Sequence, residues 1–272
     1  MTVCIGGICD SQKAIVLASD GMITSRMPPI QFETITKKMT VLSDKCIALT
    51  AGDALAYAEL FSMVKLEIDK ENKKGINNIV TKIKENYKFL RKRAIQERIL
   101  NPRAFDDFNS FYEKQQTLLS NVALIIQKQI DQFNYMLDIL ICGISNGEAH
   151  IYTIINPGTS ICYDTIGFNA IGIGSIHAIN TLVSRECHSQ KSLEEVFLII
   201  YEAKKRAEIA PGVGSKVTDL SIITQEKIIQ FPREQIDKVD DIYKMWIEHK
   251  TEWKNELSKL IEKVSKEQGE NN

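Results

Sequence analysis

Four short β-rich runs, all before residue 54, constrain the fold of this chain more than any other feature. Each run is six to eight residues of mostly apolar or β-branched side chains, bounded by turn formers such as Asp10-Ser11 and Ser43-Asp44. Four strands this early predict that the chain begins in a β-sheet. The runs cover residues 2–8, 14–21, 37–42 and 46–53, and a linker at 22–36 contains Pro28-Pro29.

Three of these runs carry a chemically useful side chain at or near an end, namely Thr2, Asp20 and Lys38. Thr2 follows Met1, which the cell normally removes before a small second residue. Its free α-amine would then titrate with a pKa of about 8 and could take the proton of the neighbouring hydroxyl. A nearby lysine favours the alkoxide, an aspartate holds that lysine charged, and a glycine N–H such as that of Gly52 can stabilise an oxyanion.

The segments MTVCIGGICD, AIVLASDGMIT and TKKMTVLSDKCIALTAGDALAYAELF resemble the start of a proteasome-type β subunit, or of its bacterial two-component relative. These proteins are N-terminal-nucleophile hydrolases. The resemblance implies that Thr2 is the nucleophile, Asp20 the strand-end aspartate, Lys38 the catalytic lysine and Gly52 the glycine of the oxyanion hole. It also implies that Thr50 lies beside the first specificity pocket.

The resemblance resumes between residues 138 and 224, so it covers somewhat more than half of the chain. A strand pair around 138–152 resembles the central strands of the family. The segment 172–178 resembles its glycine-rich turn into a helix, Ser192 begins the next helix, and residues 211–223 resemble its final loop and strand.

Two parts of the chain depart from the pattern of active family members. Ile173 stands in the glycine-rich turn where they have a serine, and Pro211 and Gly214 stand in the late loop where they have an aspartate and a serine. Ser175 and Ser215 lie one or two positions away and are the candidates for supporting Thr2 instead. The nucleophile, aspartate, lysine and glycine are therefore kept, whereas their supporting residues are not.

The remaining pattern predicts helices at 54–71, 76–99 and 105–133, strands at 136–143, 148–155 and 159–165, helices at 176–186 and 191–209, and two closing strands within 217–231. This order fits an α+β fold, and the resemblance implies a four-layer αββα sandwich of two antiparallel sheets. We expect one domain at 1–232 with a helical insertion at about 100–134. An amphipathic helix or helix pair should follow at 233–272, with Trp246, Trp253 and Leu257 on its apolar stripe.

Composition excludes several classes of protein. With 44% hydrophobic and 25% charged residues the chain is typical of a soluble globular protein, and its net charge of −1 does not favour nucleic-acid binding. No apolar run is long enough to span a bilayer, and no signal peptide is predicted at the N-terminus. The six cysteines form no CxxC pair and the four histidines no metal-binding motif, so we expect free thiols in a reducing cytoplasm, no metal and no cofactor.

The prediction is therefore a cytoplasmic threonine protease of the proteasome-like type, acting on a peptide or protein. A homo-oligomer is expected, with an unfoldase or ring partner as a further candidate. Two alternatives stay open: a catalytically silent structural subunit of the same fold, and a stand-alone hydrolase of small amides. The departures at Ile173, Pro211 and Gly214 favour the first, and the helical insertion and C-terminal helix favour the second, because they could block ring stacking.

Overall fold

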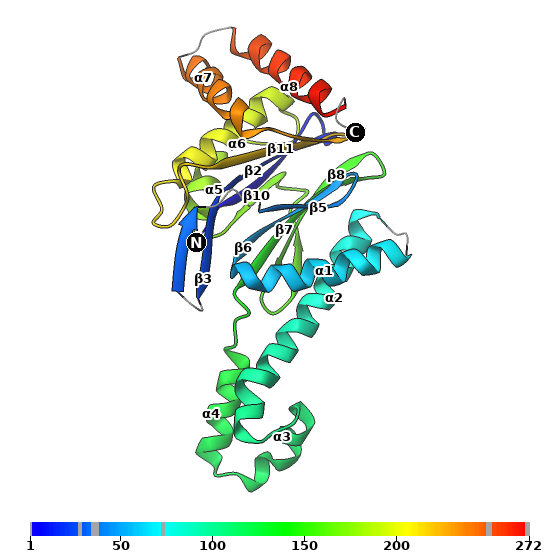
Figure 1. Ribbon diagram of the computed structural model, residues 1–272, viewed down its shortest axis with the longest axis vertical. Coiled ribbons are helices and arrows are strands. Elements are labelled where there is room, and N and C mark those ends of the chain that lie inside the picture. The colour runs from blue at the N-terminus through cyan, green and yellow to red at the C-terminus, as the bar shows by residue number, and fades with distance from the viewer. Residues whose placement is uncertain (1, 27–28, 34–37, 72–73, 249–251, 270–272) are drawn as a thin grey trace.

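The computed structural model describes residues 2–26, 29–33, 38–71, 74–248 and 252–269 (Figure 1). Within these residues the chain forms two five-stranded sheets, a separate two-stranded hairpin and eight α-helices, and every strand pair is antiparallel. The predicted α+β class is therefore confirmed, with strands gathered at the start, the middle and the end of the chain.

The first sheet joins the two ends of the sequence. Its strands run in the order β10-β1-β2-β11-β12, so β2 lies between β1 and a strand that comes about 200 residues later. Every residue of β1 and β2 is buried, which explains why both strands read as continuous apolar runs. The strands are β1 (Cys4–Cys9), β2 (Ala14–Asp20), β10 (Phe168–Ile171), β11 (Thr218–Ile223) and β12 (Ile228–Gln230).

The second sheet follows the sequence order β5-β6-β7-β8-β9. The turn between β7 and β8 is Asn146-Gly147, and both residues have positive φ, of 53° and 83°, as the Asn-Gly hairpin signal predicts. The strands are β5 (Met39–Ser43), β6 (Cys46–Gly52), β7 (Leu137–Ser145), β8 (Glu148–Ile155) and β9 (Thr159–Cys162).

Three apolar clusters define how the sheets and helices are layered. One cluster lies between the two sheets and combines Leu17 of the first with Leu49 and Leu140 of the second. A second cluster joins the outer face of the second sheet to α1 (Ala54–Glu71) and α2 (Ile76–Ile95). The third joins the outer face of the first sheet to α5 (Ser175–Ser184), α6 (Leu193–Ala207), α7 (Ile236–Ile247) and α8 (Trp253–Gly269).

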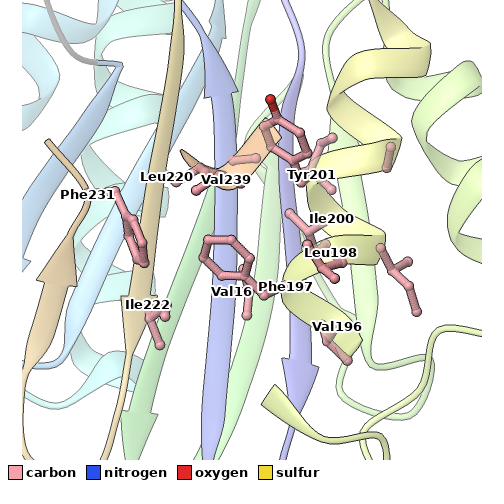
Figure 2. Packing of buried hydrophobic residues seen from close by; sticks show 14 of the residues in the cluster. Val16, Val196, Phe197, Leu198, Ile200, Tyr201, Leu220, Ile222, Phe231 and Val239 are labelled. Atoms are coloured by element: carbon pink, nitrogen blue, oxygen red, sulfur yellow. The ribbon is translucent and has the colours of Figure 1, made fainter. Parts of the chain in front are cut away.

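Helix α6 is the centre of the third cluster (Figure 2). It begins where the sequence predicts, because Ser192 and Glu195 form a reciprocal capping box. The run 196–201 is buried where α6 packs against β1 and β2, and each large apolar side chain withdrawn from water contributes about 1.5–3 kcal/mol to folding. Both C-terminal helices share this core through Val239, Ile242, Leu257, Leu260 and Val264.

A helical arm extends away from the sheets (Figure 1). Helix α2 continues as a π-helical turn (Gln96–Leu100) and a 3-10 turn (Asn101–Arg103), followed by α3 (Phe108–Lys114) and α4 (Ser120–Asp131). The expected single helix at 105–133 is thus two helices, separated by a 3-10 turn (Gln115–Thr117) and the extended Leu118. The arm has its own apolar cluster, made of Ile95, Ile99, Leu100, Phe105, Phe111, Ile126 and Ile130.

Two strand assignments from the sequence were wrong. Residues 22–36, expected to be a linker, contain the hairpin of β3 (Met22–Arg26) and β4 (Pro29–Glu33). The Pro28-Pro29 pair reads as a strand breaker, yet proline is tolerated as the first residue of an edge strand, where Pro29 lies. The short strand β10 was not expected either. Residues 27–28 and 34–37 of the same segment, including Lys37 of the predicted third strand, lie outside the described residues.

Candidate active site

Thr2, Asp20 and Lys38 meet at one end of the first sheet. Thr2 lies just before β1, and Asp20 is the last residue of β2. The antiparallel register pairs Cys4 with Ser19, so the start of β1 and the end of β2 lie side by side. Lys38 directly precedes β5 of the second sheet, and its side chain reaches across to the first.

The Thr2 hydroxyl lies between a carboxylate and an ammonium group. It donates a hydrogen bond to Oδ1 of Asp20 and accepts one from Nζ of Lys38. Lys38 also donates to Oδ1 of Asp20, at 2.7 Å. The positive charge beside the oxygen favours the alkoxide, so this arrangement can prepare a weak nucleophile for attack.

Asp20 is held by main-chain donors on both of its oxygens. The N–H of Val3 donates to Oδ1 at 3.1 Å. The N–H groups of Met22 and Gly214 donate to Oδ2, at 3.2 Å and 2.8 Å. Hydrogen bonds to a carboxylate are stronger than those between neutral groups, so these donors offset the cost of burying the charge.

The ion pair of Asp20 and Lys38 is withdrawn from solvent. The side chain of Asp20 is fully buried and that of Lys38 is 7% exposed. Removing one partner from a buried pair leaves an uncompensated charge, which typically costs about 3–5 kcal/mol. Each residue therefore needs the other to remain buried, and loss of either one should destabilise the fold.

The glycine-rich turn after β10 holds the main chain of Thr2. The N–H of Gly174 donates to the Thr2 carbonyl at 3.2 Å. Gly172 has a φ of 92°, and a Cβ on this residue would overlap the same carbonyl oxygen. Ile173 between them is 49% exposed. The turn thus positions Thr2 with backbone groups, although it lacks the serine expected from the resemblance.

Gly52 and Thr50 lie at the end of β6, near the start of β1. The carbonyl of Thr50, which is itself buried, accepts a hydrogen bond from Sγ of Cys4 at 3.4 Å. Gly52 has a φ of 123°, and the N–H of the next residue donates to Met136. This places the end of β6 beside the chain start. No hydrogen bond among the described residues joins Gly52 or Thr50 to the Thr2 side chain.

Gly52→Ala should lower the free energy of unfolding by about 2–4 kcal/mol, because it combines an unfavourable φ with an overlap of Cβ with the carbonyl of Met136. Gly147→Ala is the matched control, since its φ is also positive but its Cβ would meet open space. We expect the control to cost about 1 kcal/mol. Equilibrium denaturant unfolding measures both, and equal losses would contradict the role assigned to backbone overlap.

The residues expected to support Thr2 have different environments. Ser175 begins α5 and its N–H donates to the carbonyl of Gly172. Ser215 and Pro211 are exposed. Among the described residues, no hydrogen bond joins the hydroxyl of Ser175 or Ser215 to Thr2. Gly214, which stands where a side-chain donor was expected, instead supplies its backbone N–H to Asp20.

Cys4, two residues after Thr2 in the chain, has a buried thiol. Burial raises the pKa of the Cys4 thiol to about 12, although the nearby Lys38 charge acts to lower it. Burial likewise raises the pKa of Cys46 to about 12. All six cysteines are free. Because the thiolate is the reactive form, Cys4 stays protonated and unreactive at neutral pH.

Sequence reasoning missed four groups around Asp20. Three are the main-chain donors of Val3, Met22 and Gly214, and the fourth is the carboxylate of Glu33, which contacts the late loop. Backbone donors have no residue-type signal in a sequence. Glu33 had one, because apolar and polar residues alternate from Ile30 to Glu33 as they do in a half-buried strand.

No protein-family model matches the chain, and a search of curated proteins finds no match. In the part of the chain that the structure describes, no cluster of three or more histidine, cysteine, aspartate or glutamate side chains could hold a metal ion. None of the helices formed by the described residues is both long and apolar enough to cross a membrane.

Proposed function

We propose that this chain is an N-terminal-threonine hydrolase that cleaves amide bonds, with Thr2 as its nucleophile once Met1 has been removed. The single observation that carries the proposal is the Thr2 hydroxyl held between the buried carboxylate of Asp20 and the ammonium of Lys38. A threonine without a chemical role would not need a buried ion pair beside its hydroxyl. Burying an aspartate and a lysine costs folding free energy, and their contact with one hydroxyl is what a nucleophilic site requires.

The proposed reaction is acyl transfer to Thr2 followed by hydrolysis. Oγ1 of Thr2 attacks the amide carbonyl carbon while the free α-amine of Thr2 takes the hydroxyl proton. The C–N bond then breaks, the leaving amine receives that proton, and an ester to Thr2 remains. Water attacks the ester, releases the carboxylic acid and restores the hydroxyl. Lys38 stabilises the alkoxide, and Asp20 holds Lys38 in place.

Gly52 has the proposed role of oxyanion donor, and Thr50 that of lining the first specificity pocket. Both lie at the end of β6, beside the start of β1. The layering of two antiparallel sheets between helices supports the αββα sandwich of N-terminal-nucleophile hydrolases. From the resemblance we propose a peptide or protein substrate, a homo-oligomer in the cytoplasm, and an unfoldase or ring partner.

Intact mass spectrometry of the natively expressed chain tests the proposal. The mass is measured before and after incubation with a peptide epoxyketone, which closes a ring with both the free amine and the hydroxyl of an N-terminal threonine. We expect loss of Met1 followed by one stoichiometric adduct. Thr2→Ala is the matched control, because alanine also permits removal of Met1 but has no hydroxyl.

A chain that retains Met1 and forms no adduct would contradict the proposal. That outcome would favour the structural-subunit alternative. Among the described residues, neither the Ser175 hydroxyl nor the Ser215 hydroxyl forms a hydrogen bond to Thr2, which is consistent with that alternative. Size-exclusion mass then separates the remaining alternatives. A ring-sized assembly fits a protease of the proteasome type, whereas a monomer that forms the adduct fits a stand-alone amide hydrolase.

A further inference from the structure

Glu33 joins two segments that surround Asp20. It is the last residue of β4 and lies opposite Met22 of β3. Its Oε1 accepts the backbone N–H of Lys216 at 3.0 Å and that of Val217 at 3.4 Å. One carboxylate oxygen therefore connects the β3–β4 hairpin to the loop that precedes β11.

The same loop contains the shortest main-chain hydrogen bond to Asp20. Gly214 donates its N–H to Oδ2 at 2.8 Å. A Cβ on Gly214 would overlap Oε1 of Glu33 and would lie 3.0 Å from its Cδ and 3.2 Å from Oδ2 of Asp20. The two carboxylates thus approach Gly214 closely, and a Cβ fits there only if the Glu33 carboxylate moves.

Both donors to Oδ2 of Asp20 belong to segments that Glu33 connects. Met22 lies opposite Glu33 in the hairpin, and Gly214 lies two residues before Lys216 in the loop. Neither donor belongs to the same secondary-structure element as Asp20. The Glu33 carboxylate therefore joins the two segments that carry these donors, in addition to the pairing of Thr218 with Asp20.

We propose that Glu33 is a positioning residue for the Thr2 site, acting as the hydrogen-bond acceptor that fixes the late loop so that Gly214 can hold Asp20. The proposal rests on the hydrolase function proposed above. Asp20 in turn orients Lys38 and the Thr2 hydroxyl, so a shift of the loop is transmitted to the nucleophile. Glu33 does not touch the hydroxyl, and its removal should slow the chemical step rather than weaken binding.

The test measures how fast the peptide epoxyketone forms its adduct on Thr2 in a set of variants. The dependence of that rate on reagent concentration gives kinact, the maximal rate, and KI, the concentration at half of it. Glu33→Ala should lower kinact by about 10–100-fold with KI within about twofold, because small misplacements of reacting groups have effects of this size. Glu33→Gln keeps an acceptor oxygen and should stay within about threefold of the wild type. Glu226→Ala, an exposed glutamate in the β11–β12 turn, is the matched control and should change neither constant.

A double-mutant cycle with Gly214→Ala tests the contact itself. The added Cβ should displace the Glu33 carboxylate, so this variant should lose about as much kinact as Glu33→Ala. The double variant has no carboxylate left to displace, and its kinact should lie within about threefold of either single variant. Such strong non-additivity is expected only for residues in contact.

Several outcomes would overturn the proposal. An adduct on the wild type with unchanged kinact in Glu33→Ala would refute the role of Glu33 alone, as would additive losses in the cycle or an equal loss in Glu33→Gln. No adduct on the wild type would refute both this role and the hydrolase function. If Glu33→Ala does not fold, Glu33→Asp, which retracts the carboxylate by one methylene, replaces it in the same comparison.

Discussion

Replacing Thr2 with alanine should reduce amide hydrolysis to the background rate while leaving the fold intact. Losing a covalent nucleophile typically lowers kcat by about a million-fold, which would place the rate below detection in most assays. The free energy of unfolding should change by only about 1 kcal/mol, because Asp20 and Lys38 still bind each other directly at 2.7 Å. Hydrolysis of a peptide substrate and denaturant unfolding measure the two quantities.

Two controls complete this experiment. Thr2→Ser keeps a hydroxyl and an N-terminal amine, so it should retain measurable turnover. Thr159→Ala removes an exposed threonine from β9 and should leave the rate unchanged. Unchanged hydrolysis in Thr2→Ala would show that the activity belongs to another group or to a contaminant.

The second large effect is expected at Asp20. Asp20→Ala should lower the free energy of unfolding by about 3–5 kcal/mol, because it leaves the Lys38 ammonium buried without its counter-charge and removes the acceptor of three main-chain donors. Activity should fall with it, since Lys38 is no longer aimed at the hydroxyl. Chemical denaturation gives the stability, and the rate per folded molecule gives the activity.

The double variant Asp20→Ala with Lys38→Met separates the two causes of that loss. Removing both charges eliminates the unpaired ammonium, so part of the lost stability should return, whereas activity should not. Asp20→Asn is a further control, because it preserves the shape and one acceptor oxygen but not the charge. A double variant less stable than Asp20→Ala would show that the ion pair is not the main reason for burying Lys38.

The core strands could be predicted from the sequence because a fully buried strand appears there as a continuous run of apolar residues. Strands β1, β2 and β6 are continuous apolar runs, and all three lie close to the expected positions. Contact among Thr2, Asp20 and Lys38 was also expected, because each residue lies at or near the end of a strand and the resemblance assigns all three to one site. Their contact in the structure agrees with that expectation.

The other groups of the site were not predicted, for physical reasons. Gly214 was read as the loss of a supporting side chain, but its contribution is a backbone N–H and the absence of a Cβ. A backbone N–H has no residue type of its own. Glu33 was hidden because the prolines before it indicated a linker, and its partners, the N–H groups of Lys216 and Val217, are more than 180 residues away.

The position of β2 between β1 and β11 has a consequence for how this protein is made. A ribosome-bound chain that ends before Gly214 has one edge of β2 unpaired and lacks the Gly214 donor to Asp20. The contacts of the residues synthesised first therefore cannot be complete until most of the chain has been synthesised. Such non-local pairing is slow to form. We therefore expect the site around Thr2 to be complete only after β11 has been translated.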